Sequence, residues 1–423
     1  MIINVLQWRF AEKAAFRFAF ILLFLFIIVF NNGAFILLAP LAGYITAGLH
    51  VFIPWFAKNF LHLPQQISQF TNGSGDTTYD YVVLLVITLA SIAGSIIWTF
   101  TDRKRANYNR LFYWLTVIVR FYLGLMLIQY GLYKVIKTQF PFPGFYRLLS
   151  TYGESSPMGL AWTFLGYSKG YNLFMGIAEL MGGLLFFRKT VTLGAVISLM
   201  TAANVMAVNY FYDVPVKIVS TGMVMMCLFL LLPNFSRLFQ FFIKGEPAKL
   251  RSLVPPVISR RWLYYSKYGV KYLFIIIGIG LPLFQILNLR SQYGDHAPKP
   301  PLYGAYEVNN FTVGNDTLKT GSAAAVRWKL LLLEDVGNAV IRYENNKREW
   351  VKINTDTVNH KLSFVFEQDS ANVVSYQYTK PDSLHLILTG KPGKDLVRIE
   401  LTKKKFLLLD RKFNWVNETP FNR

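Results

Sequence analysis

The sequence predicts a polytopic α-helical membrane protein that carries a C-terminal all-β domain outside the membrane. The 423-residue chain is 53% hydrophobic and only 16% charged, whereas soluble globular chains are about one quarter charged. Long apolar runs separated by basic clusters occupy residues 18–289. After a Pro-rich linker at 295–304, apolar and polar residues alternate, which is typical of half-buried strands.

The formal net charge of +21 lies mostly beside the apolar runs, as the positive-inside rule expects of cytoplasmic flanks. We therefore expect the lipid bilayer as a partner, and no nucleic acid. Cys227 is the only cysteine, so neither an intrachain disulfide nor a CxxC redox pair can form. The five histidines are not spaced as metal ligands, and no covalently bound cofactor or metal is expected.

The first apolar run, 18–30, follows a short basic stretch and has no small-x-small cleavage site after it, so we interpret it as an uncleaved span. The run 35–61 is interrupted by prolines and glycines, and Lys58 is the only Lys or Arg between 31 and 79. It is therefore expected to stay outside as an interfacial or re-entrant segment. The other expected spans are 81–100, 111–135, 171–187, 191–209, 214–232 and 270–289.

Seven crossings place every basic cluster on one side. This predicts a bacterial inner-membrane protein with a cytoplasmic N-terminus and a periplasmic C-terminal domain. The expected divisions are an N-terminal membrane region (1–110), a four-helix core (111–233), a basic loop with the seventh span and linker (234–300), and the β domain (301–423).

The loop between the third and fourth spans contains Ser156 followed by Pro157, a helix-start signal. The apolar stretch 158–166 is too short to span, so we expect a re-entrant or surface helix. Aromatic residues on these outer segments are expected to form an interfacial belt, with contact to a quinone head group as the alternative. They are Phe140, Phe142, Phe145, Tyr146, Trp162, Tyr167, Tyr210, Phe211 and Tyr212.

In the C-terminal region, alternation is clearest at 362–367, 374–379 and 397–401. Turn signals occur at 314–315, 337–338, 345–346, 359–360 and 392–393, at the short spacing of an antiparallel meander. These features predict a small closed or nearly closed barrel, because closure removes exposed strand edges.

Polar residues inside the apolar runs form the candidate site, because an isolated charge near the bilayer centre costs at least about 2.5 kcal/mol. Arg120 and Lys134 share one face of the third span, about 80° wide, with Gly124 and Gly131. Small residues let another helix approach closely. The full set of candidates is Arg120, Lys134, Glu179, Asn204, Asn209, Asp213 and Lys217.

Each of these groups has a structural interpretation beside the functional one. Lys134 and Arg120 can snorkel toward the interface. Glu179 is either a carboxylate paired with one of the nearby cations (Arg120, Lys134 or Lys217) or an acid that exchanges protons or binds substrate. Asp213 is expected to cap the sixth span, with Pro215 in its first turn and Lys217 one turn inward.

The stretch GIAELMGGLLFFRKTVTLGA resembles the signature of the DoxX-like family of four-helix membrane proteins. The segments RFYLGLMLIQYGLYKVIKTQFPFP, SSPMGLAWTFLGYSKGYN, NYFYDVPVK, TNGSGDTTYDY and FNWVNETPFNR resemble the long Bacteroidetes-type members. Some DoxX relatives are subunits of a thiosulfate:quinone oxidoreductase, and others associate with thiol-redox enzymes. The resemblance transfers no catalytic residue, and the missing cysteine pair argues against thiol chemistry by this chain alone.

Three functions follow as hypotheses. The first is a membrane subunit that handles a quinone or lipid-like small molecule in a redox or envelope-maintenance system. The second is a proton-coupled transporter that uses Glu179. The third is a non-catalytic scaffold whose β domain recruits an extracytoplasmic protein partner. Enzymatic activity is left open; if present, it would be that of an oxidoreductase-associated membrane subunit.

Overall fold

The computed structural model describes residues 7–63, 67, 75–252, 254–257, 259–318, 327–366, 369–411 and 413–422. The chain forms two compact units. The helical unit comprises Met1–Pro141 and Ser156–Arg290, and the β unit comprises Phe142–Ser155 and Ser291–Arg423. The expected fold class, a polytopic helical region followed by a small β domain, is confirmed.

The helical unit is built around α4 (Asn109–Val135), which contacts α1, α7, η3, α9 and α11. Its central turns are buried on nearly every side. The remaining elements of this unit are α1 (Phe10–Val29), η1 (Ile36–Leu38), α2 (Ala39–Asn59), α3 (Thr78–Thr101), α6 (Pro157–Tyr167), α7 (Lys169–Leu180), η3 (Met181–Phe186), α8 (Val191–Phe211), α9 (Lys217–Leu231), η4 (Leu232–Asn234), α10 (Phe235–Lys244) and α11 (Arg261–Arg290).

Within the described residues, six helices are long and apolar enough to cross a membrane, by length and composition. They are Ile36–Asn59, Thr78–Thr101, Asn109–Val135, Val191–Phe211, Lys217–Lys244 and Arg261–Arg290. Four of them contain an expected span, and Lys217–Lys244 overlaps the expected span 214–232. The expected first span lies in α1, which also carries Glu12, Lys13 and Arg17, and the expected fourth is divided between α7 and η3.

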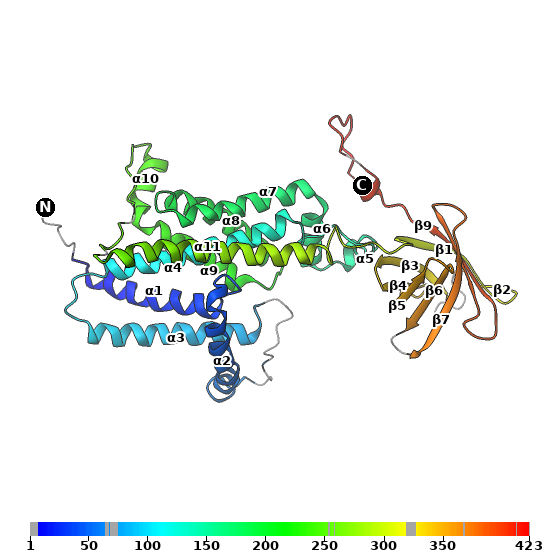
Figure 1. Ribbon diagram of the computed structural model, residues 1–423, viewed down its shortest axis with the longest axis horizontal. Coiled ribbons are helices and arrows are strands. Elements are labelled where there is room, and N and C mark those ends of the chain that lie inside the picture. Colours follow the sequence, from blue (N-terminus) through cyan, green and yellow to red (C-terminus); the bar gives the residue numbers. More distant parts are fainter. Residues whose placement is uncertain are drawn as a thin grey trace. The chain divides into compact units, whose positions relative to one another are not determined.

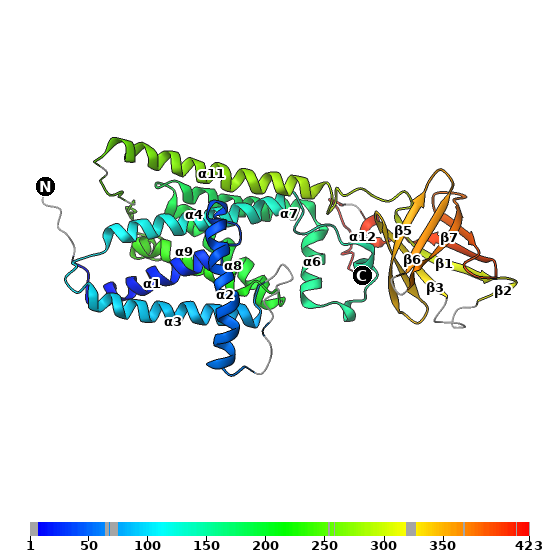
Figure 2. The same cartoon turned by 60° about the horizontal axis from the view of Figure 1, so that its bottom comes forward.

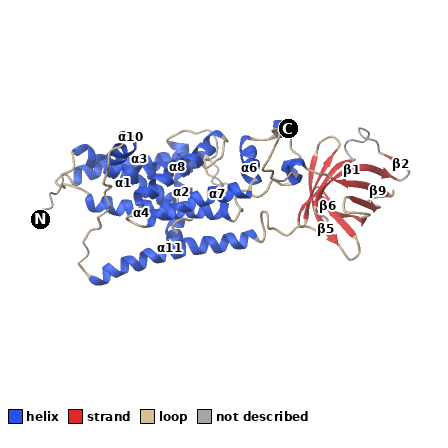
Figure 3. Cartoon of the chain, turned by 90° about the horizontal axis from the view of Figure 1, so that it is seen from above, coloured by secondary structure: helices blue, strands red, loops and turns tan. Residues whose placement is uncertain are grey.

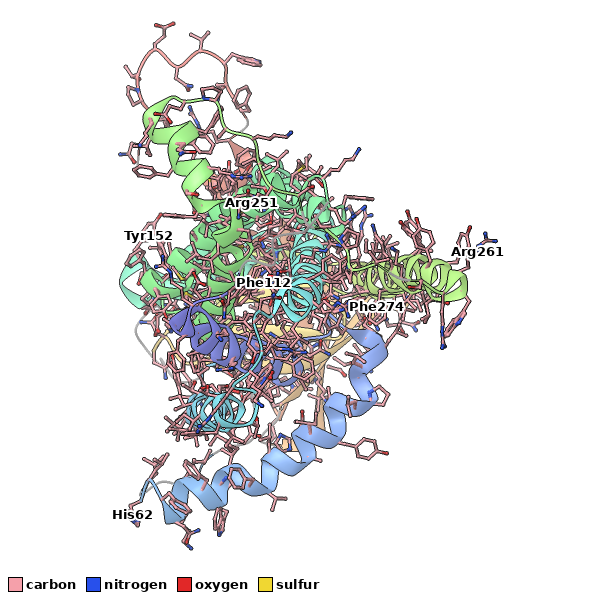
Figure 4. All side chains as sticks on the ribbon, turned by 90° about the vertical axis from the view of Figure 1, so that its left-hand side faces the viewer. His62, Phe112, Tyr152, Arg251, Arg261 and Phe274 are labelled. Atoms are coloured by element: carbon pink, nitrogen blue, oxygen red, sulfur yellow. The ribbon has the colours of Figure 1, made fainter. Side chains whose placement is uncertain are left out.

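The helix α2 is long and apolar, yet it runs across the helical unit instead of along it (Figure 2). In the end-on view, α2 is seen lengthwise, passing from the neighbourhood of Phe274 toward His62 (Figure 4). This direction fits the interpretation of 35–61 as a segment that does not cross with the other helices. Residues 64–66 and 68–74 of the loop that follows lie outside the described residues.

The basic segments of the helical unit gather at the end that holds the N-terminus, where α10 and the α3–α4 loop also lie (Figure 1). Arg17 is buried there and donates to Tyr108 Oη at 2.9 Å and Thr99 Oγ1 at 2.9 Å. Asn234 joins the start of α8 to the segment after α10 by donating to Thr192 Oγ1 at 3.0 Å and accepting from Arg251 N at 2.8 Å. Shared placement of these clusters is what the positive-inside interpretation requires.

The β unit is an antiparallel barrel, shown in red in Figure 3. Strands β1 and β3 to β9 pair with their neighbours in chain order, and β1 also pairs with β9, which closes the barrel. The short β2 pairs with β1 and with no other described strand. The strands are β1 (Gly304–Val313), β2 (Asp316–Thr317), β3 (Trp328–Asp335), β4 (Asn338–Tyr343), β5 (Arg348–Asp356), β6 (Lys361–Phe366), β7 (Asp369–Thr379), β8 (His385–Gly390) and β9 (Val397–Lys403).

Alternation along the strands fills the barrel interior, as expected. Leu362 and Phe364 of β6 and Ile399 of β9 are fully buried, and Trp328 packs edge-on against Phe364 at 5.4 Å between ring centroids. Each expected turn joins two strands. At Gly337 the backbone adopts φ +82°, which glycine accepts without steric cost.

Residues 142–155 leave the helical unit and fold as part of the β unit. They form α5 (Phe145–Leu148) and η2 (Tyr152–Glu154). Phe145 packs with Tyr303 and Phe406 in an apolar cluster on β3 and β4. Phe145 is buried among these side chains, so its assignment to an interfacial belt is wrong, whereas Tyr146 is exposed and contacts Trp350 of the β unit. Beyond β9 lies the single turn α12 (Leu407–Asp410).

Candidate functional site

Lys134 of α4 and Glu179 of α7 form a buried ion pair. Lys134 Nζ lies 2.7 Å from both Oε1 and Oε2 of Glu179. Their side chains are only 6% and 2% exposed. Lys134 therefore does not snorkel to the interface, and among the three cations considered it is the partner of Glu179.

Small residues bring the two helices close enough for this contact. A Cβ atom added at Gly131 would lie 2.8 Å from the carbonyl oxygen of Gly176. The backbones of α4 and α7 are therefore in direct contact one turn before the ion pair, as at other small-residue interfaces between membrane helices. This confirms the expectation of close helix approach at Gly131.

Aromatic rings surround the Lys134 ammonium. The ring centroids of Tyr130 and Phe140 each lie 5.7 Å from Nζ, within the range of cation–π attraction. Phe140 in turn meets Trp162 of α6 edge-on at 5.1 Å between centroids. An ammonium has three N–H donors, so hydrogen bonds to the two carboxylate oxygens leave one that can serve a ligand.

The ion pair lies on the wall of a cavity of about 1160 Å³ within the helical unit. Apolar side chains from α1, α3, α4, α6, α7, α8 and α9 make most of its surface. Its polar contributions include Lys134, Glu179, Gln139, Asn204 and Asn209, and its aromatic ones include Phe140, Trp162, Tyr171 and Tyr212. A largely apolar cavity with a few convergent polar groups is the usual form of a small-molecule site.

Two of the expected polar residues, Asn204 and Asn209 of α8, line this cavity with the ion pair. Asn209 is buried and donates from Nδ2 to the Val216 carbonyl oxygen at 3.3 Å, which fixes the α8–α9 turn. Asn204 is exposed. The structure therefore joins four of the seven candidates: Lys134, Glu179, Asn204 and Asn209.

Asp213 and Lys217 pair with each other. Lys217 Nζ lies 2.9 Å from Asp213 Oδ1, and the Asp213 side chain is 81% exposed. The expectation that Asp213 caps α9 is wrong, because α9 begins only at Lys217. Asp76 performs this role from a distant loop, accepting from Lys217 N at 2.5 Å and Ile218 N at 2.9 Å.

Arg120 is also buried, 14 residues before Lys134 on α4, and lines a second cavity. Its Nε and Nη1 have no hydrogen-bond partner among the described residues. Arg120 therefore neither pairs with Glu179 nor reaches the α3–α4 loop.

Sequence reasoning missed Tyr130 and Asp76. Tyr130 lies four residues before Lys134 and so shares its face of α4, a signal that helical spacing does contain. Asp76 had no local signal, because it caps a helix that begins 141 residues later. Among the described residues, no group of three or more His, Cys, Asp or Glu side chains could hold a metal ion.

A comparison with known proteins finds the uncharacterized protein YwoB of Bacillus subtilis (strain 168), which is 34% identical to this chain over 145 residues. The match covers 32% of this chain and 86% of YwoB. No protein-family model matches the chain. No solved structure matches it.

Proposed function

The chain belongs to the family of the uncharacterized protein YwoB, and from its site geometry we propose that it binds a quinone- or lipid-like small molecule in the Lys134–Glu179 cavity. The observation that carries this proposal is the ion pair itself, placed on the wall of a largely apolar cavity of about 1160 Å³. A volume of this order accommodates a ring with an isoprenoid or acyl chain.

The chemistry of the cavity wall fits a flat molecule with carbonyl oxygens. Lys134 has an N–H left to donate, and Asn204 offers a side-chain amide on the same wall. The rings of Phe140 and Trp162 supply apolar faces near the ammonium. The Glu179 carboxylate, 2.7 Å from the ammonium, compensates its charge while the remaining N–H of Lys134 donates to a carbonyl oxygen of the ligand.

We also propose that the helical core of this chain is of the DoxX-like type. It is supported by the packing of α4 against α7, η3 and α9, and of α8 against α9 and η3, which together form a helical core over the residues that carry the resemblance. A thiol-redox role would place the dithiol on a partner protein, because Cys227 is the only cysteine of this chain.

The test is a mass-spectrometric inventory of quinones and lipids that co-purify with the full chain. Val205→Trp places an indole in the cavity, whereas Met200→Trp, on the same helix but 72% exposed and away from the cavity, is the matched control. We expect a quinone or lipid to be retained by the wild type and by Met200→Trp and lost from Val205→Trp. Equal retention by both variants would exclude this cavity as the site.

Proton-coupled transport is a second candidate, because Glu179 is an ionisable group on a cavity wall. The bidentate contact with Lys134 favours binding over transport, since a carboxylate held at both oxygens exchanges its proton less readily. Charge movement by the wild type in liposomes, absent with Glu179→Gln, would reverse this order.

We also propose the orientation expected from the basic clusters, with the N-terminus in the cytoplasm and the β unit in the periplasm of the inner membrane. Cys227 is fully buried, so added cysteines report on their own positions. In intact spheroplasts, Gly393→Cys should label with a membrane-impermeant thiol reagent and Ser252→Cys should not. Labelling of Ser252→Cys before lysis would overturn the orientation.

A further inference from the structure

Helix α11 contacts the rest of the helical unit mainly through its C-terminal half. Its buried residues are Gly278, Pro282 and Ile286, spaced four apart on one face. A Cβ atom added at Gly278 would lie 2.8 Å from Leu125 Cδ2, so this is the point of closest approach to α4. No residue of the N-terminal half of α11, 261–277, is fully buried. This half stands apart from the other helices (Figure 3).

A second cavity, of about 870 Å³, lies beside this open half of α11. Its walls come from α1, η1, α2, α4 and α11, with Arg188 and Pro255 from the connecting segments. Phe274 of α11 meets Phe35 edge-on at 5.8 Å between centroids. In the end-on view, Phe274 labels the place where α11 comes near α2 (Figure 4). This cavity is distinct from the one beside Lys134 and Glu179.

Arg120 is the unusual group in this cavity. The residue is only 4% exposed, yet Nε and Nη1 have no hydrogen-bond partner among the described residues. Buried guanidinium donors without acceptors are costly, and native proteins rarely leave them unmet. The free donors of Arg120 therefore indicate an acceptor that comes from outside the chain.

Other charges around Arg120 point to an anion. Arg188, Lys267 and Lys271 also line the cavity, and no described lining residue is a carboxylate. Arg188 and Lys271 lie near enough to Arg120 for the charges to repel. Like charges gathered in a partly dry site are stabilised when an anion joins them.

The lining of the cavity combines cations with apolar side chains. Its cations are Arg120 of α4, Arg188, and Lys267 and Lys271 of the first half of α11. Its apolar side chains include Phe24, Ile28, Leu38 and Leu41 from α1, η1 and α2. An occupant that matches both kinds of lining has an anionic head and a hydrocarbon chain.

We propose that this cavity binds a membrane lipid with an anionic phosphate head group, whose acyl chain lies along α1. Arg120 donates to the phosphate through the N–H groups of its guanidinium, as charge-assisted hydrogen bonds. Arg188 and Lys271 add charge attraction at the head group. The lipid thus packs against the N-terminal half of α11, where no residue is fully buried by the protein.

The test titrates the detergent-purified full chain with phosphatidylglycerol or phosphatidylcholine of the same acyl chains, and reads binding by native mass spectrometry and by the shift in Tm. Phosphatidylglycerol should bind about tenfold more tightly than phosphatidylcholine, a ratio within reach of charge-assisted hydrogen bonds. Arg120→Gln should abolish this preference. Arg110→Gln, on the same helix but exposed and away from the cavity, should retain it.

Val117→Trp places an indole in the cavity and leaves all of its charged residues in place. It tests the same proposal if Arg120→Gln does not fold. Loss of phosphatidylglycerol from Val117→Trp supports the proposal, and full retention overturns it. Equal binding of the two lipids, or an unchanged preference in Arg120→Gln, also overturns it. Release of phosphatidylglycerol by millimolar inorganic phosphate would show a site for a free anion and not for a lipid.

Discussion

The ammonium of Lys134 lies 2.7 Å from each carboxylate oxygen of Glu179, and this contact joins α4 to α7 inside the helical unit. Lys217 is held by Asp213 and Arg120 faces another cavity, so Lys134 is the cation that balances Glu179. Removing one partner of a buried pair leaves the other charge uncompensated, which typically costs about 3–5 kcal/mol.

Glu179→Gln should therefore lower the Tm of the detergent-purified protein markedly. Adding Lys134→Met to the same chain should restore much of the loss, because no buried charge then remains. Thermal unfolding of the two single variants and the double variant measures this coupling. A Glu179→Gln protein as stable as the wild type would show instead that the carboxyl group is retained for function at a cost to the fold.

Asp76 stabilises the start of α9 by accepting from two of its free amide groups. Asp76→Ala should reduce the free energy of unfolding by about 1–2 kcal/mol, the usual effect of removing a helix cap. Asp213→Asn, which suits the left-handed φ of +51° at this position, should change it by less than about 0.5 kcal/mol, because the Asp213 side chain is exposed. Equal losses in the two variants, measured by thermal unfolding, would contradict this assignment.

Residue spacing along the sequence predicts the β barrel and the close contact between α4 and α7. Alternation and turn residues suffice for the barrel, because register and the buried face follow from a period of two. The glycines beside Lys134 and Glu179 likewise predict a close helix contact. The identity of the pair, and the capping of α9 by Asp76, depend on which distant segments meet, and a single sequence carries no local signal for that.

Glu334 of β3 is partly buried and accepts from Phe145 N at 2.9 and 3.1 Å. Burial raises the pKa of this carboxyl group, and the backbone N–H of Phe145 offsets part of the rise. Between its ordinary and raised pKa values, the folded state holds more protons than the unfolded state. Stability of the β unit should therefore fall as pH rises through that interval.

The matched variant is Glu334→Gln, which keeps an acceptor for the Phe145 amide and removes the charge. The wild type should lose Tm relative to Glu334→Gln as the pH rises from 4 to 7. A hydrogen bond from Asn359 lowers the pKa of Asp356, and one from His385 lowers the pKa of Asp382. These two carboxyl groups therefore make stability rise with pH, opposite to Glu334. They are present in both proteins, so their effect cancels in the comparison. A difference in Tm that does not vary with pH would contradict the role of Glu334.

Residues 142–155 complete the β unit, which sequence patterns alone did not indicate because the first strand, β1, begins only at Gly304. Phe145 fills an apolar cluster with Leu330, Leu332 and Val340, and Arg348 donates to Tyr146 Oη at 2.7 Å and to Glu154 Oε2 at 3.3 Å. The fragment 291–423 therefore lacks a buried aromatic side chain and leaves the Glu334 carboxylate without its amide donors.

We expect 291–423 alone to show a β-type circular dichroism spectrum, because the closed barrel and its interior core lie within that fragment. Joining 142–155 ahead of it through a flexible linker should raise its Tm, since burial of one Phe side chain contributes about 1.5–3 kcal/mol. The same linked chain with Phe145→Ala is the control and should melt near the unlinked fragment. Equal Tm values for the linked, unlinked and Phe145→Ala proteins would show that the loop rests on the barrel without stabilising it.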